Sequence, residues 1–425
     1  MNFLRRWVSV GITGLVLCSV PSTFQLYAQD VETTPLIELL THIPGTPENR
    51  NDVLFVDRRA IETAYPGAQM PANFAAFDSM LASSELTETQ AAGAAWWNAI
   101  FQMYIPTGRY LLQMGTMPNL LGIDYFDIDQ ELQYGTPPNG GLILAGEFQT
   151  IGPEVILGVR EYQEVSDGLW CLDGDCTTGQ AMSLSDRDLA NPFGGEFGRF
   201  QPILVQENLL ASSTTPVQLG YTPTGEHIGG VSLADHDDIV DAIHALESLG
   251  TIVQVAMWDG TMVGIYENFG DVLGSNIEGD TLSFEELPPI APYSLFVIGD
   301  VVSTDEQMTA ATFVFETPEE AQSALDEMQR RLDTLISTRT SDVYREEFEG
   351  RDATIRTQVF EGENYAVGLL ILSTDKPTVD DLLAFSTSNT APTLRPGLLY
   401  STLYRMVISR DTAWFAYNAT ILTNN

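Results

Sequence analysis

The fold class is decided by the stretch at residues 294–336, SLFVIGDVVSTDEQMTAATFVFETPEEAQSALDEMQRRLDTLI. It opens with two apolar segments, Ser294–Val302 and Ala311–Glu316, that are typical of β-strands. The segment Thr317-Pro318-Glu319-Glu320 then predicts a helix start, because it combines a cap residue, a proline at the first helical position and acids in the first turn. Two strands followed by an amphipathic helix indicate a sheet covered by a helix. The apolar stripe of that helix, which runs to about residue 336, consists of Ala321, Leu325, Met328, Leu332 and Leu335.

The same alternation of strands and capped helices continues along the rest of the chain. One helix is predicted at 235–249, before a strand at 252–258, and another at about 85–104, where Thr87-x-x-Gln90 forms a capping box. Strands outnumber helices and tight turns separate many of them, which favours antiparallel or mixed sheets with helices packed on one face. We therefore predict an α+β fold. Further strands are predicted at 53–56, 142–148, 169–172, 203–206, 211–214, 218–221, 354–360, 365–372, 398–407 and 413–417.

The length of 425 residues suits two domains. A Gly- and Pro-rich stretch at 260–292 contains Leu287-Pro288-Pro289, which favours an extended connection. We predict four parts: a signal peptide at 1–28, a first α+β domain at 29–259, the connection at 260–292 and a second α+β domain at 293–425.

The first residues have the three parts of a secretory signal. Arg5 and Arg6 are followed by the uncharged apolar run Val8–Val20, and Ala28 supplies the small residue at the cleavage site. The apolar run is shorter than the ~20 residues that span a bilayer. We therefore predict a secreted, cell-surface or periplasmic protein without a membrane span after cleavage. A retained N-terminal anchor and a lipoprotein attached through Cys18 remain as alternatives.

Two cysteines remain after the predicted cleavage, Cys171 and Cys176. An even number of cysteines in an exported chain predicts a disulfide, and the Asp173-Gly174 turn between them can bring the flanking segments together. Because the closed loop is very short, we expect it to stabilise the fold by less than the ~3 kcal/mol of a longer loop. A two-thiolate metal site is the alternative, although no further Cys or His lies nearby in the sequence.

The composition combines an ordinary globular core with a strongly acidic charge. Hydrophobic residues make up 44% of the chain, and the formal net charge is −39, from 58 acidic and 19 basic residues. This charge repels nucleic-acid phosphates and anionic lipid surfaces, so we expect no nucleic-acid partner. Acidity itself is compatible with solubility, with loose binding of divalent cations or with a salty habitat.

One group of residues has the donor types of a cation site. Asp237, Asp241 and His244 share one face of the helix predicted at 235–249, and His227 precedes that helix. Carboxylates and imidazoles at this spacing could ligate a divalent cation. A solvated helix face has the same composition. We expect no cofactor other than such a cation.

Sequence motifs of the common catalytic classes are absent. The chain has no Gly-x-Ser-x-Gly elbow, since Gly274-Ser275-Asn276 lacks the second glycine, and Gly194-Gly195-x-x-Gly198 lacks the dinucleotide spacing. The surrounding loop, Asn191–Phe200, contains glycines and aromatics that suit either the lining of a cleft or a tight turn.

Three short segments carry a resemblance to known sequences. They are Ile43-Pro44-Gly45-Thr46-Pro47, Gly122-Ile123-Asp124 with Asp127 and Asp129, and Ser232-Leu233-Ala234-Asp235. In these segments the chain resembles a class of uncharacterised exported bacterial proteins built from tandem α+β units. The resemblance implies export and an α+β fold, and it brings no known activity.

Taken together, these observations predict an extracytoplasmic, non-enzymatic protein that binds a ligand or partner, or that belongs to the cell envelope. Two alternatives are a secreted hydrolase with its site in a cleft between the two domains, and a divalent-cation-binding protein.

Overall fold

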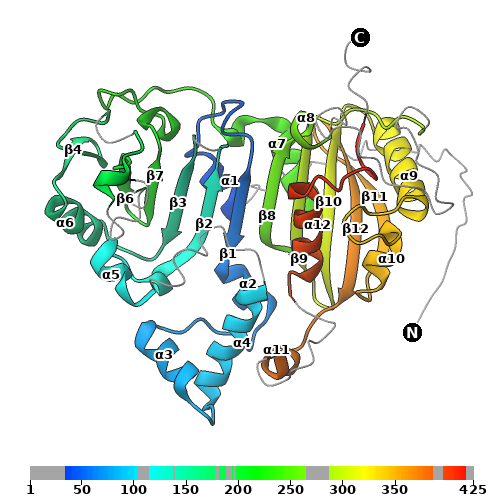
Figure 1. Ribbon diagram of the computed structural model, residues 1–425, viewed down its shortest axis with the longest axis horizontal. Helices are drawn as coiled ribbons and strands as arrows, with labels where there is room; N and C mark the ends of the chain where they lie inside the picture. The colour runs from blue at the N-terminus through cyan, green and yellow to red at the C-terminus, as the bar shows by residue number, and fades with distance from the viewer. Residues whose placement is uncertain are drawn as a thin grey trace, which may run out of the picture. The chain divides into compact units, whose positions relative to one another are not determined.

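One antiparallel sheet of twelve strands connects the two halves of the described chain (Figure 1). Its order is β11-β12-β10-β9-β8-β1-β2-β3-β7-β6-β5-β4. Each strand pairs antiparallel with its neighbours, so the predicted α+β class is confirmed. The strands are β1 (Val53–Asp57), β2 (Ile128–Tyr134), β3 (Gly141–Gly146), β4 (Tyr162–Ser166), β5 (Leu169–Leu172), β6 (Ile203–Gln206), β7 (Leu209–Ser213), β8 (Thr251–Asp259), β9 (Leu295–Val302), β10 (Glu306–Phe315), β11 (Thr354–Glu361) and β12 (Ala366–Asp375).

This computed structural model describes residues 34–102, 114–136, 139–177, 181–187, 194, 198–264, 287–385 and 396–417. From Pro35 on, the described residues form one compact unit. The predicted signal peptide, Gly274-Ser275-Asn276 and most of the Asn191–Phe200 loop lie outside the described residues. The division into two domains stays a prediction; β8 and β9, which flank the predicted connection, are hydrogen-bonded neighbours.

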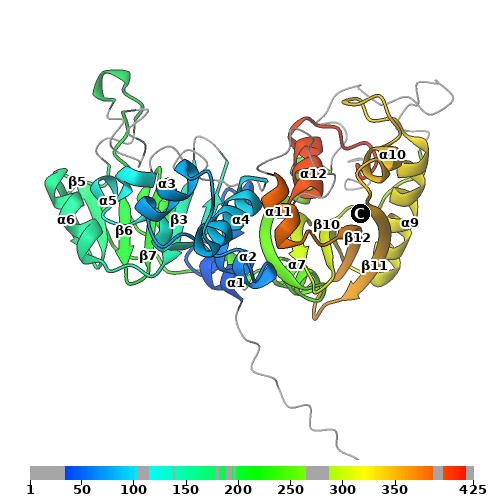
Figure 2. The same cartoon turned by 90° about the horizontal axis from the view of Figure 1, so that it is seen from below.

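Helices lie against both faces of the sheet, whereas the sequence predicted them on one face only. The side chains of β9 alternate: Leu295 and Val297 pack with α7, while Phe296 and Ile298 pack with α9 and α12. Figure 2 shows α7 and α12 on opposite sides of the strands. The helices are α1 (Pro35–Leu40), α2 (Arg58–Ala64), α3 (Phe74–Ala82), α4 (Glu88–Gln102), α5 (Met117–Leu120), α6 (Ile151–Val159), α7 (Asp237–Glu247), α8 (Gly260–Val263), α9 (Pro318–Thr334), α10 (Tyr344–Glu349), α11 (Val379–Phe385) and α12 (Leu398–Ile408), with short 3-10 turns η2 (Tyr125–Asp127), η3 (Leu184–Asp186), η5 (Pro216–Leu219) and η6 (Leu233–Asp235).

The strand–strand–helix unit predicted at 294–336 is present. The hydroxyl of Thr317 accepts a hydrogen bond from the backbone N–H of Glu320 at 3.2 Å and so caps α9. The strand β10 starts at Glu306, five residues before the predicted start at 311, because the polar residues Gln307 and Thr309 interrupt the apolar pattern.

The strand predicted at 398–407 is wrong, because this segment forms the helix α12. A short apolar run does not by itself distinguish a buried strand from a helix. Burial follows helical spacing here, with Leu399, Leu403, Met406 and Val407 against the sheet. The strand predicted at 218–221 is also wrong: Pro216 opens the 3-10 turn η5 instead. Residues 413–417 form a turn rather than the predicted strand.

The predicted disulfide is confirmed. Cys171 and Cys176 are bonded across a turn in which Asp173 and Gly174 take left-handed φ angles of 53° and 74°. Both cysteines are buried and belong to the core on the α7 side of the sheet. In the part of the chain that the structure describes, no helix is both long and apolar enough to span a membrane.

Asp241 ties α7 to the turn between β11 and β12. Its Oδ1 accepts the backbone N–H of Glu363 at 3.0 Å, and its Oδ2 accepts those of Asn364 and Tyr365 at 3.0 and 2.9 Å. Asp241 is only 2% exposed. A carboxylate that accepts three backbone N–H groups satisfies donors that the turn itself cannot pair.

A second polar cluster is buried in the sheet where β8, β9 and β10 meet. The carboxylate of Asp300 accepts hydrogen bonds from Gln254 at 3.0 Å, from Gln307 at 3.4 Å and from Thr309 at 3.5 Å. Asp300 is fully buried, and burial raises its pKa to about 6. The three hydrogen bonds favour the ionised form and offset only part of this effect.

We expect Asp241→Asn to destabilise the fold by about 2–4 kcal/mol. The amide has no charge, and it has one acceptor oxygen instead of two for the three backbone N–H donors. Denaturant unfolding monitored by circular dichroism measures this. Asp237→Asn is the control, because Asp237 lies exposed on the same helix; it should cost less than about 1 kcal/mol. Equal losses in the two variants would contradict the anchoring role.

We expect Asp300→Asn to stabilise the protein at pH 7. The folded-state pKa of Asp300 lies above the unfolded value, so the ionised form costs stability at neutral pH, and this cost disappears as pH falls from about 6 to 4. An amide at 300 can also donate to Oε1 of Gln254, which has no partner.

The expected gain of Asp300→Asn is on the order of 1–3 kcal/mol at pH 7, and it should shrink towards zero at pH 4. Urea unfolding at both pH values tests this. Asp375→Asn, an exposed change on β12, should show no such difference. If Asp300→Asn were less stable than the unchanged protein at pH 7, the charge of Asp300 would not be its dominant cost to folding stability.

Candidate functional site

The four predicted cation ligands do not come together. Among the described residues, no group of three or more His, Cys, Asp or Glu could hold a metal ion. Asp241 has both carboxylate oxygens on the β11–β12 turn, and Asp237 is exposed at the start of α7. His244 lies in the last turn of that helix. The cation hypothesis therefore lacks a ligand set in the described part of the chain.

His227 lies in a different environment. Its ring packs edge-on against Tyr221, with 5.4 Å between ring centroids, and its Nδ1 accepts the backbone N–H of Gly229 at 3.2 Å. This bond places the proton of the neutral ring on Nε2. His227 therefore presents a hydrogen-bond donor rather than a free metal-binding nitrogen.

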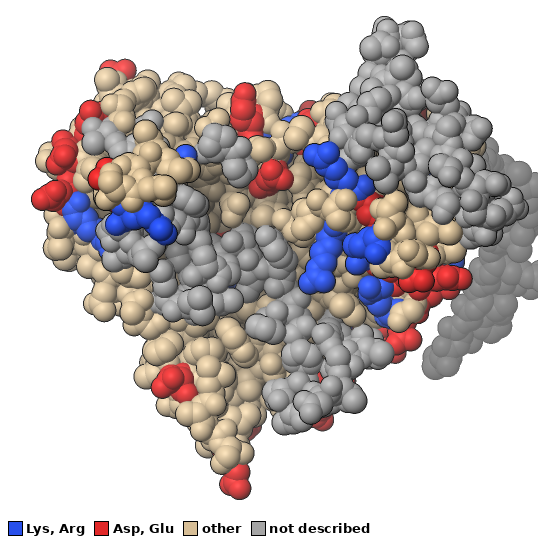
Figure 3. Space-filling model, viewed as in Figure 1, with Lys and Arg blue, Asp and Glu red and all other residues tan. Residues whose placement is uncertain are grey.

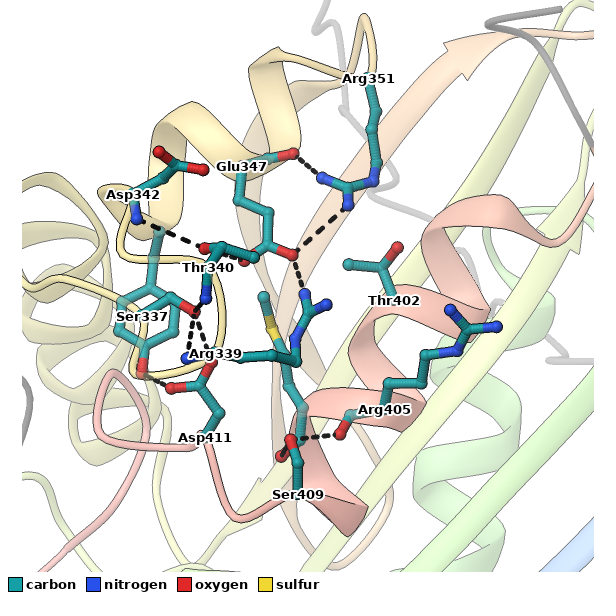
Figure 4. Close-up of polar contacts among 12 residues, drawn as sticks. Ser337, Arg339, Thr340, Asp342, Glu347, Arg351, Thr402, Arg405, Ser409 and Asp411 are labelled. Atoms are coloured by element: carbon teal, nitrogen blue, oxygen red, sulfur yellow. Dashed lines mark hydrogen bonds and ion pairs between the residues drawn. The ribbon is translucent and has the colours of Figure 1, made fainter. Parts of the chain in front are cut away.

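A cluster of three arginines is the clearest concentration of positive charge among the described residues. Arg339 lies in the loop between α9 and α10, Arg351 follows α10, and Arg405 lies on α12 (Figure 4). Figure 3 shows basic side chains gathered on this face of the molecule, over α10 and α12. Because the chain has a net charge of −39, three neighbouring guanidinium groups are a local exception to its negative charge. We call Arg339, Arg351 and Arg405 the arginine cluster.

Glu347 holds two members of the cluster. Its Oε1 accepts hydrogen bonds from Arg339 and, at 3.4 Å, from Arg351, and its Oε2 accepts one from Thr340 at 3.2 Å. Arg351 also donates to the backbone oxygen of Glu347. The Glu347 side chain is 1% exposed. One buried carboxylate thus orients two guanidinium groups but balances only one of their charges.

Arg405 adds a third positive charge beside this pair. It is exposed, and its guanidinium has no hydrogen-bond or ion-pair partner among the described residues. Burial, followed by the positive charges of Arg339 and Arg405, lowers the pKa of Arg351, and the negative charge of Asp342 offsets only part of this effect. Figure 4 shows Arg351 and Arg405 on either side of Thr402. The fold therefore holds like charges together at a cost that an anion would relieve.

Asp411 fixes the loop that carries Arg339. Its carboxylate accepts hydrogen bonds from the Ser337 hydroxyl at 2.6 Å, from the Thr338 N–H at 3.0 Å and from the Tyr344 hydroxyl at 2.5 Å. Asp411 is 2% exposed and follows the end of α12. It therefore links the loop after α9 to the helix that carries Arg405, and the arginines are placed before any ligand arrives.

Sequence reasoning missed the arginine cluster. The three residues are separated by 12 and 54 positions in the numbering and belong to no motif. The one usable signal was the scarcity of basic residues, which makes each arginine in this chain worth locating. Only the packing of α10 and α12 on one face of the sheet brings them together.

Comparisons with known proteins identify no family. No protein-family model and no curated protein matches this chain. Among solved structures, crystal form I of TP0453 matches with a TM-score of 0.27 and 5% identity, over 81% of this chain and 98% of that chain. Crystal form IV of TP0453 matches with a TM-score of 0.27 and 7% identity, over 84% of this chain and all of that chain. At these values the likeness says nothing about the function of this chain.

Proposed function

We propose that this is an extracytoplasmic, non-enzymatic binding protein that holds a small anionic ligand at the arginine cluster. One observation carries the proposal: two guanidinium groups share one buried carboxylate, and the neighbouring Arg405 has no acceptor among the described residues. Arginine offers several N–H donors in a planar fork that matches carboxylate and phosphate groups. The cluster has the charge and the donors for such a group.

The chemistry of the cluster favours binding over catalysis. Arginine stays protonated in proteins and so makes a poor acid or base. The hydroxyl of Ser337 already donates to Asp411, and burial and the charge of Asp411 raise the pKa of Tyr344 far above its ordinary value. These groups therefore hold the cluster in place and do not supply an activated nucleophile.

The charge of the whole chain limits the size of the ligand. A long polyanion would meet the acidic surface beyond the cluster and would be repelled. A small molecule with one or two negative groups experiences mainly the nearby guanidinium groups, because salt screens charges beyond about 8–10 Å. We therefore expect a small carboxylate or phosphate compound rather than a nucleic acid or another polyanion.

An extracytoplasmic location is supported by two features. The predicted signal at 1–28 directs export, and the disulfide Cys171–Cys176 belongs to oxidising compartments. A protein that meets its ligand outside the cytoplasm or in the envelope is consistent with both.

The first test measures anion binding to the mature protein by calorimetry, with inorganic phosphate, succinate and acetate as probes. We expect saturable binding of at least one probe. Arg405→Ala should weaken it about tenfold or more, a difference of about 1.4 kcal/mol, and added salt should weaken it as well. Arg405→Lys should keep part of the affinity.

Arg356→Ala is the matched control. It removes the same charge from β11, from a side chain that pairs with Glu306. Because residue 356 pairs with Ile371 of the core on the α7 side, the change lies on the sheet face opposite α12 and should leave binding intact. Unchanged affinity in Arg405→Ala, or an equal loss in Arg356→Ala, would overturn the proposal.

The second test concerns the location. Intact mass of the exported protein should show loss of about the first 28 residues and the two-hydrogen deficit of one disulfide. An unprocessed chain retained in the cytoplasm with Cys171 and Cys176 reduced would contradict the predicted location.

A further inference from the structure

A small cavity lies apart from the arginine cluster and shares no residue with it. It has a volume of about 150 Å³ and lies among the loop after α1, strand β6 and the turns that follow η5. Its apolar walls belong to the core on the α7 side of the sheet, whereas α12 packs on the other side. The lining side chains used below are His42, Ile43, Leu204, Gln206, Tyr221 and His227.

Three polar side chains of the lining have hydrogen-bonding groups to spare. The His42 imidazole and the Gln206 amide have no hydrogen-bond partner among the described residues, and His227 uses only Nδ1. Polar groups that are partly removed from water are normally paired by protein or by ligand. Their convergence on one cavity indicates a place for a molecule that both donates and accepts hydrogen bonds.

None of the residues that line this cavity is an Asp, Glu, Lys or Arg. Burial lowers the pKa of His42, so its ring offers one donor and one acceptor. Gln206 offers both kinds of group through its amide, and His227 offers a donor at Nε2. A lining of neutral donors and acceptors matches hydroxyl groups better than it matches an anion or a metal ion.

The rest of the lining is apolar side chains and backbone, apart from Thr41 and Ser232, whose hydroxyls donate to Glu38 and Asp235. Ile43, Leu204 and Tyr221 contribute buried walls. Val231 also lines the cavity and is 63% exposed, and the neighbouring lining residue Gly230 has a φ of 130° with open space where a side chain would be. A ligand with one apolar face and a hydroxylated edge fits both parts of this surface.

The volume sets the size of the ligand. A cavity of about 150 Å³ is large enough for a six-membered ring, since an engineered cavity of that size in another protein binds benzene. We infer that this cavity is a binding site for a single neutral sugar ring, taken either as a free monosaccharide or as the terminal unit of a longer glycan. Such a ring combines hydroxyl donors and acceptors with an apolar C–H face.

The test uses the mature protein and saturation-transfer NMR, with glucose, galactose and N-acetylglucosamine as separate probes. We expect saturable binding of at least one sugar. Gln206→Ala and His42→Ala should each weaken it about tenfold, while His244→Ala, a histidine change outside the cavity, should have no effect. Because the lining is neutral, about 0.5 M salt should leave the affinity unchanged.

Several results would overturn the inference. They are absence of binding by all three sugars, retention of binding in both Gln206→Ala and His42→Ala with normal unfolding curves, or displacement of the sugar by inorganic phosphate. The outcome is independent of the arginine cluster, because Arg405→Ala should bind the sugar as the unchanged protein does. Comparing each monosaccharide with its disaccharide shows whether a free sugar or a glycan end is preferred.

Discussion

The pairing of β8 with β1 on one side and β9 on the other is the interaction on which the rest of the described structure depends. These three strands are separated by long stretches of sequence, yet their hydrogen bonds unite strands β1–β8 with strands β9–β12 in one sheet. A sheet of this length has two wide apolar faces, and each must be covered. The helices α7, α9 and α12 are placed by that requirement, and α12 carries Arg405.

Buried polar groups restrict how the helices can be arranged over the sheet. Asp241 accepts three backbone N–H groups from a turn more than a hundred residues away, and Arg58 forms a fully buried ion pair with Glu131 while its guanidinium lies 4.0 Å from the ring centre of Tyr125. Such groups are costly unless their partners are in place. They therefore favour one arrangement of helices over alternatives that would bury as much apolar surface. Asp300 is the exception, since its three neutral donors leave the charge only partly compensated.

The net charge of the chain does not show how charged side chains are distributed over the surface, and this distribution bears on function. A net charge of −39 describes the chain as a whole and favours solubility, but two guanidinium groups beside α10 share Glu347, and Arg405 of α12 lies near one of them. The cavity near His42 and Gln206 is neutral and lies on the other face. The two regions differ in charge and in lining, so they suit ligands of different chemistry and can be examined independently.

Acidity, the disulfide and the α+β class were within reach of the sequence, because each depends on local features: residue counts, two cysteines beside a turn, and periodicities such as the capped stripe at 317–336. Export stays a prediction from the charged and apolar first residues. The error at 398–407 has the same origin, since an apolar run carries no local mark that separates helix from strand. The contacts of Asp241 with the β11–β12 turn and the meeting of Arg339, Arg351 and Arg405 were decided only by the tertiary structure. Their partners are distant in the chain, and spacing along one helix says nothing about which other segment will cover it.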